Sequence, residues 1–453
     1  MQAAFHSNGT YCIGMHLYLY ITHKCSPIQL IANQLRMKTS YYNYYIPYGD
    51  DYIIYNGLSE FYFTVSKERI KLFEELLKNP DEYINLYPDF YARMNNLRFI
   101  CDDEINEMEF VRLKFHNRQH HEEYHLMLLP TYQCNLRCWY CIQEHADAYM
   151  SPDIVSAIKL HIHKKVNEEH IKLFTLSWFG GEPLLAYDIV KEITSYSNQL
   201  CKKLNKKFDC SITTNGTLLN DVRIKELHKA GVTHYQITID GIKADHDKIK
   251  RLKSVSAYET VLKNINLLPG YSTCALRFNY TRKNTKPDQI ISELNQRLSK
   301  EAKKNLILSI ERVWQEQEDR ETERKIEYLC TIARDSGIFP VIHRFDMCYA
   351  DKPSFNCIFP NGKIGKCDND GMDKVPAHIE VDGQIIWPDG LKYTIPAIFD
   401  NKSECYSCKY LPVCWGPCPA KRKRMLQRQT NISCFLPDKD RMITERIIQA
   451  NFW

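Results

Sequence analysis

The chain has 453 residues, enough for two or three domains, and its net charge of +5 is too small over this length to form a surface that binds nucleic acid. The longest apolar run near the start, residues 13–21, is far shorter than the ~20 residues that cross a bilayer, so we expect no membrane anchor. Eighteen cysteines in a long chain without a recognisable signal peptide predict a reducing, cytoplasmic location and a use for cysteine other than disulfides.

The N-terminal part of the chain divides into an unpatterned leader and a small α+β domain, residues 37–120. Residues 1–36 show neither a strand period nor a helix period, so we expect this leader to be disordered or a start-site artefact. Over residues 44–65, runs rich in Tyr, Ile and Phe are separated by turn signals and predict three short antiparallel strands. Helices are expected over residues 66–78, with Ser66 as the N-cap, and over residues 103–116.

From residue 121 to residue 320, apolar strands alternate with amphipathic helical segments. Alternation of this kind predicts a parallel sheet and an α/β fold. Six strands are expected, over residues 124–129, 174–179, 210–214, 234–239, 275–280 and 306–313. That number suits a partial (β/α)6 TIM-like barrel, in which functional residues follow the carboxyl ends of the strands.

The remaining residues, 321–453, begin with a predicted helical linker. They continue, from Cys348 to Cys434, into a stretch rich in Cys, Gly and Pro that shows little regular period. A segment of this composition is expected to fold around metal.

Three cysteines follow the first predicted barrel strand at C-x3-C-x2-C spacing: Cys134, Cys138 and Cys141. Three thiolates can hold three irons of a cubane cluster and leave the fourth iron open to a small bidentate ligand. A zinc knuckle is the alternative, but zinc requires four ligands, and the nearby His145 has an unsuitable spacing.

This motif resembles the signature of radical S-adenosylmethionine (SAM) enzymes, and further segments match the family in order. Gly180, Gly181 and Glu182 are similar to its GGEP segment, whose backbone and Glu hold the methionine amino group. Asn215 and Thr238 lie in segments similar to those that face the SAM ribose, and Tyr140 occupies the aromatic position near adenine. Taken singly, these glycine-containing segments are ordinary turn sequences, and it is their serial position after successive strands that favours the resemblance.

A basic turn follows the fourth of these segments. It is similar to the family segment whose Arg contacts the SAM carboxylate, but Arg251 stands one residue later than that Arg. We therefore expect Arg251, or its neighbour Lys250, to make this contact. A solvated helix turn is an equal alternative.

A second cysteine group resembles the SPASM domain, the auxiliary-cluster module of radical SAM peptide maturases. Its members are Cys348, Cys357, Cys367, Cys405, Cys408, Cys414, Cys418 and Cys434. The resemblance implies two more 4Fe-4S clusters, three in all: a nearer one held by Cys348, Cys357, Cys367 and Cys418, and a farther one held by Cys405, Cys408, Cys414 and Cys434. Two zinc sites are the structural alternative.

Asp368 directly follows Cys367, at a position where anaerobic sulfatase maturases carry an acidic residue proposed as the base. A carboxylate beside a cluster suits the deprotonation of a substrate thiol or hydroxyl, so Asp368 is the candidate catalytic residue. Residues 368–371 are also an ordinary turn sequence, which the residue types favour slightly.

The family resemblance covers residues 124–434 and implies an oxidoreductase. Given electrons by a donor such as flavodoxin or ferredoxin, it would cleave SAM to methionine and a 5′-deoxyadenosyl radical, which takes hydrogen from a side chain. The N-terminal domain resembles the winged-helix recognition elements of enzymes that modify ribosomally made peptides (RiPPs). We therefore expect a peptide maturase that oxidises a residue of a precursor peptide or crosslinks it by a thioether or C–C bond.

Two rivals stand beside this hypothesis. An anaerobic sulfatase maturase, which forms formylglycine, shares both cysteine modules but has no evident need for the N-terminal domain. A non-catalytic iron–sulfur electron carrier gives no use to the segments at Glu182 and Asn215.

Overall fold

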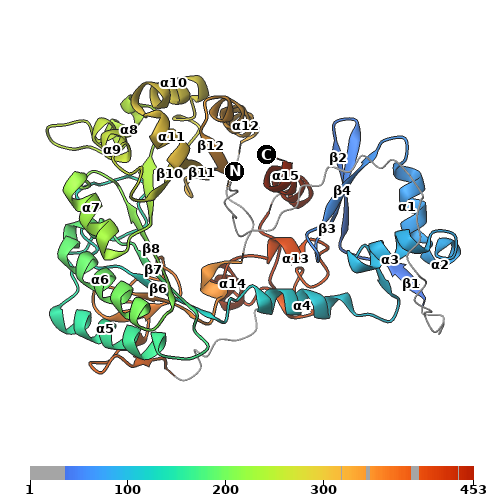
Figure 1. Cartoon of the computed structure of the whole chain (residues 1–453), viewed down its shortest axis with the longest axis horizontal. Coiled ribbons are helices and arrows are strands. Elements are labelled where there is room, and N and C mark those ends of the chain that lie inside the picture. Colours follow the sequence, from blue (N-terminus) through green and yellow to red (C-terminus); the bar gives the residue numbers. More distant parts are fainter. Residues whose placement is uncertain (1–35, 318, 343–346, 389–396, 437, 453) are drawn as a thin grey trace. The chain divides into compact units, whose positions relative to one another are not determined.

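The computed structural model describes residues 36–452 apart from residues 318, 343–346, 389–396 and 437 (Figure 1). The predicted leader lies outside the described residues except for Arg36. The chain forms two compact units. Unit 1 comprises the residues up to His116 together with Asn401–Gly416 and Ser433–Glu445, and unit 2 comprises Asn117–Asp400, Pro417–Ile432 and the residues from Arg446.

Unit 1 contains the three antiparallel strands that the sequence predicts. They are β2 (Asn43–Tyr48), β3 (Asp51–Asn56) and β4 (Tyr62–Ser66), in the spatial order β2-β3-β4. Its helices and its second, two-stranded sheet are α1 (Ile70–Lys78), α2 (Pro80–Tyr83), α3 (Pro88–Asn96), α4 (Glu107–Asn117), α13 (Leu411–Cys414), β1 (Met37–Thr39) and β5 (Ile100–Asp102). The core packs Ile54 of the sheet against Leu77, Tyr91 and Phe99.

Two helix starts differ from the prediction. Ser66 is the last residue of β4 and accepts a hydrogen bond from the backbone of Arg69, so a turn precedes α1 and Ser66 is not its N-cap. Likewise α4 begins at Glu107, because a turn follows β5. The short helices α2 and α3 each begin with a proline, which suits a first helical position.

Unit 2 contains all six predicted barrel strands, parallel and in sequence order within one sheet. They are β6 (Glu123–Leu128), β7 (Leu173–Trp178), β8 (Lys207–Thr214), β9 (His234–Ile239), β10 (Thr273–Tyr280) and β11 (Leu306–Arg312). The connecting helices are α5 (Pro152–Val166), η1 (Pro183–Ala186), α6 (Tyr187–Lys203), α7 (Asp221–Ala230), α8 (Lys243–Ile249), α9 (Ala257–Ile265), α10 (Pro287–Arg297) and α11 (Lys300–Asn305). The α/β fold with a partial parallel barrel is confirmed.

The same sheet continues beyond the prediction at both edges. Strand β12 (Phe339–Ile342), reached through the predicted linker helix α12 (Arg320–Asp335), pairs with β11. At the other edge β13 (Phe355–Ile358) lies parallel to β6 and leads into the antiparallel strands β14 (Lys363–Gly365), β15 (Ala377–Ile379) and β16 (Ile385–Ile386). The remaining elements are η2 (Tyr349–Asp351), η3 (Ala397–Phe399), α14 (Pro419–Gln427) and α15 (Lys439–Phe452).

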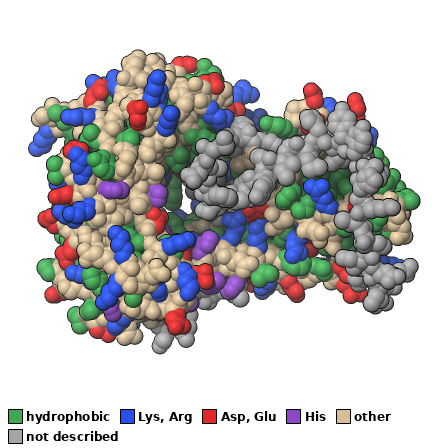
Figure 2. Space-filling view, viewed as in Figure 1, with side chains coloured by type: hydrophobic (Ala, Val, Ile, Leu, Met, Phe, Trp, Pro, Cys, Tyr) green, Lys and Arg blue, Asp and Glu red, His purple; other side chains and the backbone are tan. Residues whose placement is uncertain are grey.

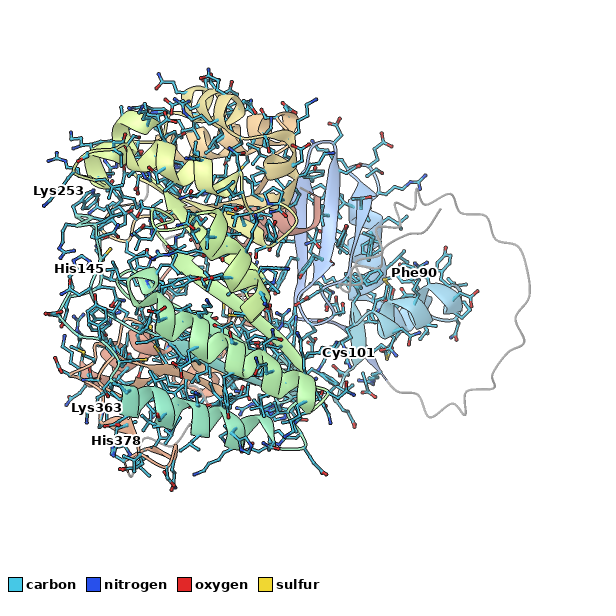
Figure 3. All side chains as sticks on the ribbon, turned by 60° about the vertical axis from the view of Figure 1, so that its left-hand side comes forward. Phe90, Cys101, His145, Lys253, Lys363 and His378 are labelled. Carbon is cyan, nitrogen blue, oxygen red and sulfur yellow. The ribbon has the colours of Figure 1, made fainter. Side chains whose placement is uncertain are left out.

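The two faces of the barrel sheet differ in polarity. One face is covered by helices such as α5, α6 and α7, which lie side by side (Figure 3), and it buries alternate residues such as Leu126, Leu176 and Ile237. The other face carries polar side chains linked by hydrogen bonds, for example His125 to Ser177. The strands therefore alternate in polarity and leave a polar inner face.

Every helix within the described residues is too short or too polar to span a bilayer. On the face shown in Figure 2, Lys and Arg side chains of unit 2 are interspersed with Asp and Glu side chains.

Candidate active site

The three cysteines of the C-x3-C-x2-C motif, called the first set (Cys134, Cys138 and Cys141), lie in the loop after β6. The next loop holds this one in place, because the backbone of Gly181 donates to Thr131 and that of Glu182 donates to Gln133, at 3.1 and 2.8 Å. A Cβ on Gly181 would lie 2.2 Å from the Gln133 carbonyl oxygen. Only glycine permits this approach, so Gly181 contributes to the shape of the cysteine loop.

The three cysteines of the first set are half-buried. Burial, and to a smaller extent the Cys138 and Cys141 thiols, raise the pKa of Cys134 to about 11. Burial also raises the pKa of Cys138, and the ammonium group of Lys250 opposes this rise. A cation bound by Cys134 and Cys138 would therefore displace protons from these two thiols.

Glu182 ties together the loops after β7 and β8. Its fully buried carboxylate accepts hydrogen bonds from the backbone of Leu184, the hydroxyl of Thr214 and the backbone of Asn215, at 3.0, 2.8 and 2.8 Å. Burial raises the pKa of Glu182 although these bonds oppose the rise. The amide of Asn215 in turn lies 3.8 Å from the Cys134 sulfur, so the carboxylate fixes a polar group beside the first set.

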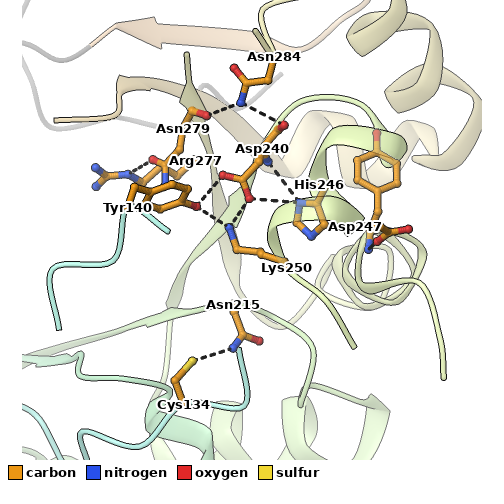
Figure 4. A network of polar contacts seen from close by, with 11 residues as sticks. Cys134, Tyr140, Asn215, Asp240, His246, Asp247, Lys250, Arg277, Asn279 and Asn284 are labelled. Carbon is orange, nitrogen blue, oxygen red and sulfur yellow. Dashed lines mark hydrogen bonds and ion pairs between the residues drawn. The ribbon is translucent and has the colours of Figure 1, made fainter. Parts of the chain in front are cut away.

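A buried ion pair lies at the carboxyl end of β9 (Figure 4). Lys250 Nζ is 2.6 Å from Asp240 Oδ2, and the side chains are 3% and 0% exposed. The hydroxyl of Tyr140 donates to Asp240 Oδ1 at 2.6 Å and accepts from Lys250 at 2.9 Å. Burial lowers the pKa of Lys250, but Asp240 and Tyr140 together raise it above its ordinary value. Lys250 is therefore charged, and the network holds Tyr140 beside Cys138.

The structure does not bring Arg251 to this network. Its guanidinium is exposed and donates to the carbonyl of Lys248 on its own turn, at 3.1 Å. Of the two basic residues that the sequence offers, Lys250 is the one in the site. Thr238 is half-buried on β9, two residues before Asp240.

The site residues predicted from the sequence do not include two residues of this network, Asp240 and His246. Asp240 stands in the predicted segment after β9, so its position was a usable signal. His246 is fully buried, and its Nδ1 accepts from the Asp240 backbone at 3.2 Å. A lone His in a basic turn gave no sequence signal.

Four further cysteines, called the second set (Cys348, Cys357, Cys367 and Cys418), all lie in unit 2. Cys357 is fully buried on β13, in register with Met127 of β6. Its pKa is raised well above the ordinary value by burial and then by Asp368 and Cys367. Burial raises the pKa of Cys348 to about 11, and the Cys418 thiol adds to the rise. Cys367 therefore acts on the pKa of Cys357, and Cys418 acts on the pKa of Cys348.

Asp368 is half-buried next to the second set. It accepts a hydrogen bond from the hydroxyl of Tyr349, which also lies 3.9 Å from the Cys367 sulfur. Gln143, two residues after Cys141, donates to the Asp368 carbonyl at 3.3 Å. The loop of the first set and the loop of Asp368 are thus in direct contact.

The last four cysteines, called the third set (Cys405, Cys408, Cys414 and Cys434), all lie in unit 1. Cys405 and Cys408 are joined by a turn in which the Cys408 backbone donates to the Cys405 carbonyl at 3.1 Å. Burial, followed by the thiols of Cys405, Cys408 and Cys434, raises the pKa of Cys414 to about 12. All four thiols are therefore neighbours.

The three sets consist of thiols, which can bind either zinc or the irons of a cluster. Within the described part of the chain, no three His, Cys, Asp or Glu side chains converge as one metal ion requires. Zinc draws its sulfur ligands to about 2.3 Å from a single point. In a four-iron cluster each thiolate binds a different iron, so thiols grouped around a larger body are suitable.

Comparisons with known proteins agree with this geometry. Residues 128–275 match the family model of the Radical SAM superfamily. The chain is 32% identical over 189 residues to GTP 3',8-cyclase of Campylobacter jejuni subsp. doylei, across 39% of this chain and 53% of the cyclase. It thus spans about half the length of the curated relatives that it matches.

Solved structures align with this chain at low identity. Native anSMEcpe with bound AdoMet and Cp18Cys peptide aligns with a TM-score of 0.54 at 16% identity, over 72% of this chain and 96% of that one. Streptococcus suis SuiB bound to precursor peptide SuiA aligns with a TM-score of 0.48 at 16% identity, over 89% of this chain and 99% of that one.

Proposed function

We propose that this chain, a radical SAM enzyme, oxidises or crosslinks a residue of a ribosomally made peptide. The observation that carries the proposal is the contact between Gln143 and the Asp368 carbonyl. It brings the loop of the first set, a carboxylate and the second set to one end of the barrel. A substrate residue there would meet a radical source, a base and an electron acceptor together.

Three sets of thiols would hold the iron. The first set would bind a 4Fe-4S cluster with one open iron for SAM, and the second and third sets would each bind a fully ligated one. When bound, cluster and SAM supply a 5′-deoxyadenosyl radical that takes hydrogen from an unactivated carbon. Reduction would come from a carrier such as flavodoxin or ferredoxin.

The chain's own residues would bind and orient SAM. Lys250 and Asp240 fix Tyr140, whose ring would lie along the adenine, and the Lys250 ammonium is available to the SAM carboxylate. Gly180 and Asn215 would contact the methionine and ribose parts. Glu182 would act chiefly through the loops that its carboxylate joins. Thr238, on β9 two residues before Asp240, would contact the ribose.

Asp368 would serve as the base that takes a proton from the substrate. It is half-buried and already held by the hydroxyl of Tyr349, which orients the carboxylate next to Cys367. The Tyr349 hydroxyl and the Cys367 thiol both donate to Oδ1, so Oδ2 would take the proton.

A peptide substrate is supported by unit 1 and by the fold. Strand β4 is an edge of the three-stranded sheet, and an extended leader peptide would add to it as a further strand. The structure of anSMEcpe, which shares the fold, contains the Cp18Cys peptide. The likeness to GTP 3',8-cyclase covers only 39% of this chain and gives no substrate.

The second candidate is formylglycine formation by an anaerobic sulfatase maturase, which Asp368 and the shared fold favour. Mass spectrometry of a candidate precursor after anaerobic turnover separates the two. We expect a loss of two hydrogens per modification together with fragment ions that show two residues joined, because conversion of Ser to an aldehyde also removes two hydrogens. Conversion of a sulfatase-motif Cys or Ser to an aldehyde would instead establish the second candidate.

A further inference from the structure

The third set lies in a segment with little structure of its own. Residues 401–416, called the cysteine loop, contain no strand, and α13 is their only helix, with four residues. The loop nevertheless belongs to unit 1 together with β2, β3 and β4. A loop of this kind gains a fixed shape from what its thiols bind, because regular hydrogen bonding does not supply one.

Tyrosines in and just before strand β2 contact the cysteine loop. The hydroxyl of Tyr44 donates to the Lys409 carbonyl at 2.6 Å, and that of Tyr41 donates to the Ser407 carbonyl at 2.8 Å. The rings of Tyr44 and Tyr410 lie 5.0 Å apart. Both carbonyls belong to residues flanking Cys408, so their positions follow the position of a ligand of the third set.

The face of the sheet opposite α1 and α3 is buried where this loop meets it. Tyr44 and Tyr55 stack with ring centroids 5.8 Å apart, and they are 3% and 5% exposed. Gly57 lets the loop close in, because a Cβ there would lie 2.3 Å from the Tyr44 hydroxyl and 3.2 Å from Pro412. Without the loop, aromatic surface of an edge strand would be open to water.

Helix α4 packs against the other end of the loop. The ring of Phe115 lies 5.5 Å from that of Trp415, which directly follows Cys414 and is 3% exposed. The loop therefore contacts β2 on one side of its ligands and α4 on the other.

We propose that binding of a four-iron cluster by the third set completes the fold of unit 1, so that the peptide-recognition domain is ordered only in the metal-loaded enzyme. In this role the bound cluster stabilises β2 and α4, and the role does not depend on electron transfer by the cluster. The link to recognition rests on the proposed function, whereas the link to folding does not.

Hydrogen–deuterium exchange on the full chain tests the proposal. Exchange of residues 43–56 is measured in the unmutated chain before and after anaerobic reconstitution with iron and sulfide. The same is done for Cys414→Ser, which removes a ligand of the third set, and for the matched control Cys357→Ser, which removes one of the second set.

We expect loading to slow exchange of residues 43–56 about tenfold in the unmutated chain and in Cys357→Ser, but not in Cys414→Ser. Each variant should lose about four irons. Equal protection in Cys414→Ser and the unmutated chain would overturn the proposal, as would zinc in place of iron in the third set. If Cys414→Ser is insoluble, absence of slowing on loading the unmutated chain overturns it. Because neither peptide nor SAM enters this measurement, its outcome is independent of the substrate.

Discussion

Lys250 and Arg251 are adjacent in the sequence, yet the fold gives them opposite environments. Lys250 is 3% exposed and paired with Asp240, whereas Arg251 is exposed. Helix α8 ends at Ile249, so the direction of each following side chain depends on backbone angles that no periodicity predicts. The motif could therefore be predicted from the sequence, but not which basic residue enters the site.

Substitution of each residue by Met tests this assignment. Lys250→Met leaves the buried Asp240 carboxylate without its cation, so the free energy of unfolding should fall by about 3–5 kcal/mol. SAM affinity should fall roughly tenfold or more, measured by calorimetry, because a charged hydrogen-bond donor is lost. Arg251→Met, the matched control, should change stability by less than about 0.5 kcal/mol. Weaker SAM binding in Arg251→Met than in Lys250→Met would show that Arg251, and not Lys250, contacts the SAM carboxylate.

His161 links elements that lie far apart in the sequence. One ring nitrogen lies 2.8 Å from the carbonyl of Gly383 in the β15–β16 turn, and the other lies 2.5 Å from the hydroxyl of Tyr124 on β6. That hydroxyl also accepts from Asn356 on β13, at 3.1 Å. His161 therefore adds a further link between these extra strands and the barrel, beside the pairing of β13 with β6.

Acid should weaken this link. Burial lowers the pKa of His161 to about 4, below the value of about 6.5 for an unfolded chain. Between these values the unfolded chain binds a proton that the folded chain does not, so the free energy of unfolding falls as pH falls, by up to about 3 kcal/mol. Urea unfolding of the parent and of His161→Gln across this range measures the effect. The variant should show a flatter pH dependence, and an unchanged slope would contradict the assignment.

The strands of the barrel were predictable because each buries alternate apolar residues over six or more positions. Strands β12 and β13, with four residues each, were not. Strand β13 lies within the cysteine-rich stretch and is parallel to β6, for example at Cys357 and Met127. Such a pairing leaves no local pattern, since its partner is more than two hundred positions away.

The edge of β4 that faces away from β3 in the described sheet provides a test of peptide recognition. The Asn56 N–H donates to the Phe61 carbonyl, and the Lys67 N–H donates to the Asp50 carbonyl. The odd-numbered residues of β4 therefore direct their backbone polar groups towards β3. Thr64 is even-numbered, so its N–H points away from β3, and the residue is exposed. Thr64→Pro should therefore weaken precursor binding by roughly tenfold, because one backbone donor is lost while pairing with β3 persists.

Thr64→Val is the matched control, because it keeps the backbone donor. Binding is measured with a labelled leader peptide, and uncoupled 5′-deoxyadenosine formation is measured in parallel. The latter should be equal in both variants, since the first set lies in unit 2. Equal peptide affinity in Thr64→Pro and Thr64→Val would show that the leader does not add to this edge.

At the scale of the whole molecule, the chain returns to its N-terminal unit near its end. The sequence predicts contiguous domains at 37–120, 121–320 and 321–453, and these boundaries stay a prediction. Compactness groups residues 401–416 and 433–445 with the first 116 residues. The bond from Tyr44 to Lys409 spans 365 positions, and a cysteine pattern contains no information about such a partner.

The division of the thiols between the units leads to a prediction about iron. The three sets share no cysteine, and the third set lies in a different unit from the first and second, so each set should be removable without loss of the others. The reconstituted chain should hold about twelve irons. Combined replacement of Cys134, Cys138 and Cys141 by Ala should remove about a third of them and abolish 5′-deoxyadenosine formation, since only this set leaves an iron open to SAM. Iron analysis with product chromatography measures both. A total near four irons with zinc in the remainder, or continued SAM cleavage by the triple variant, would contradict the assignment of three clusters.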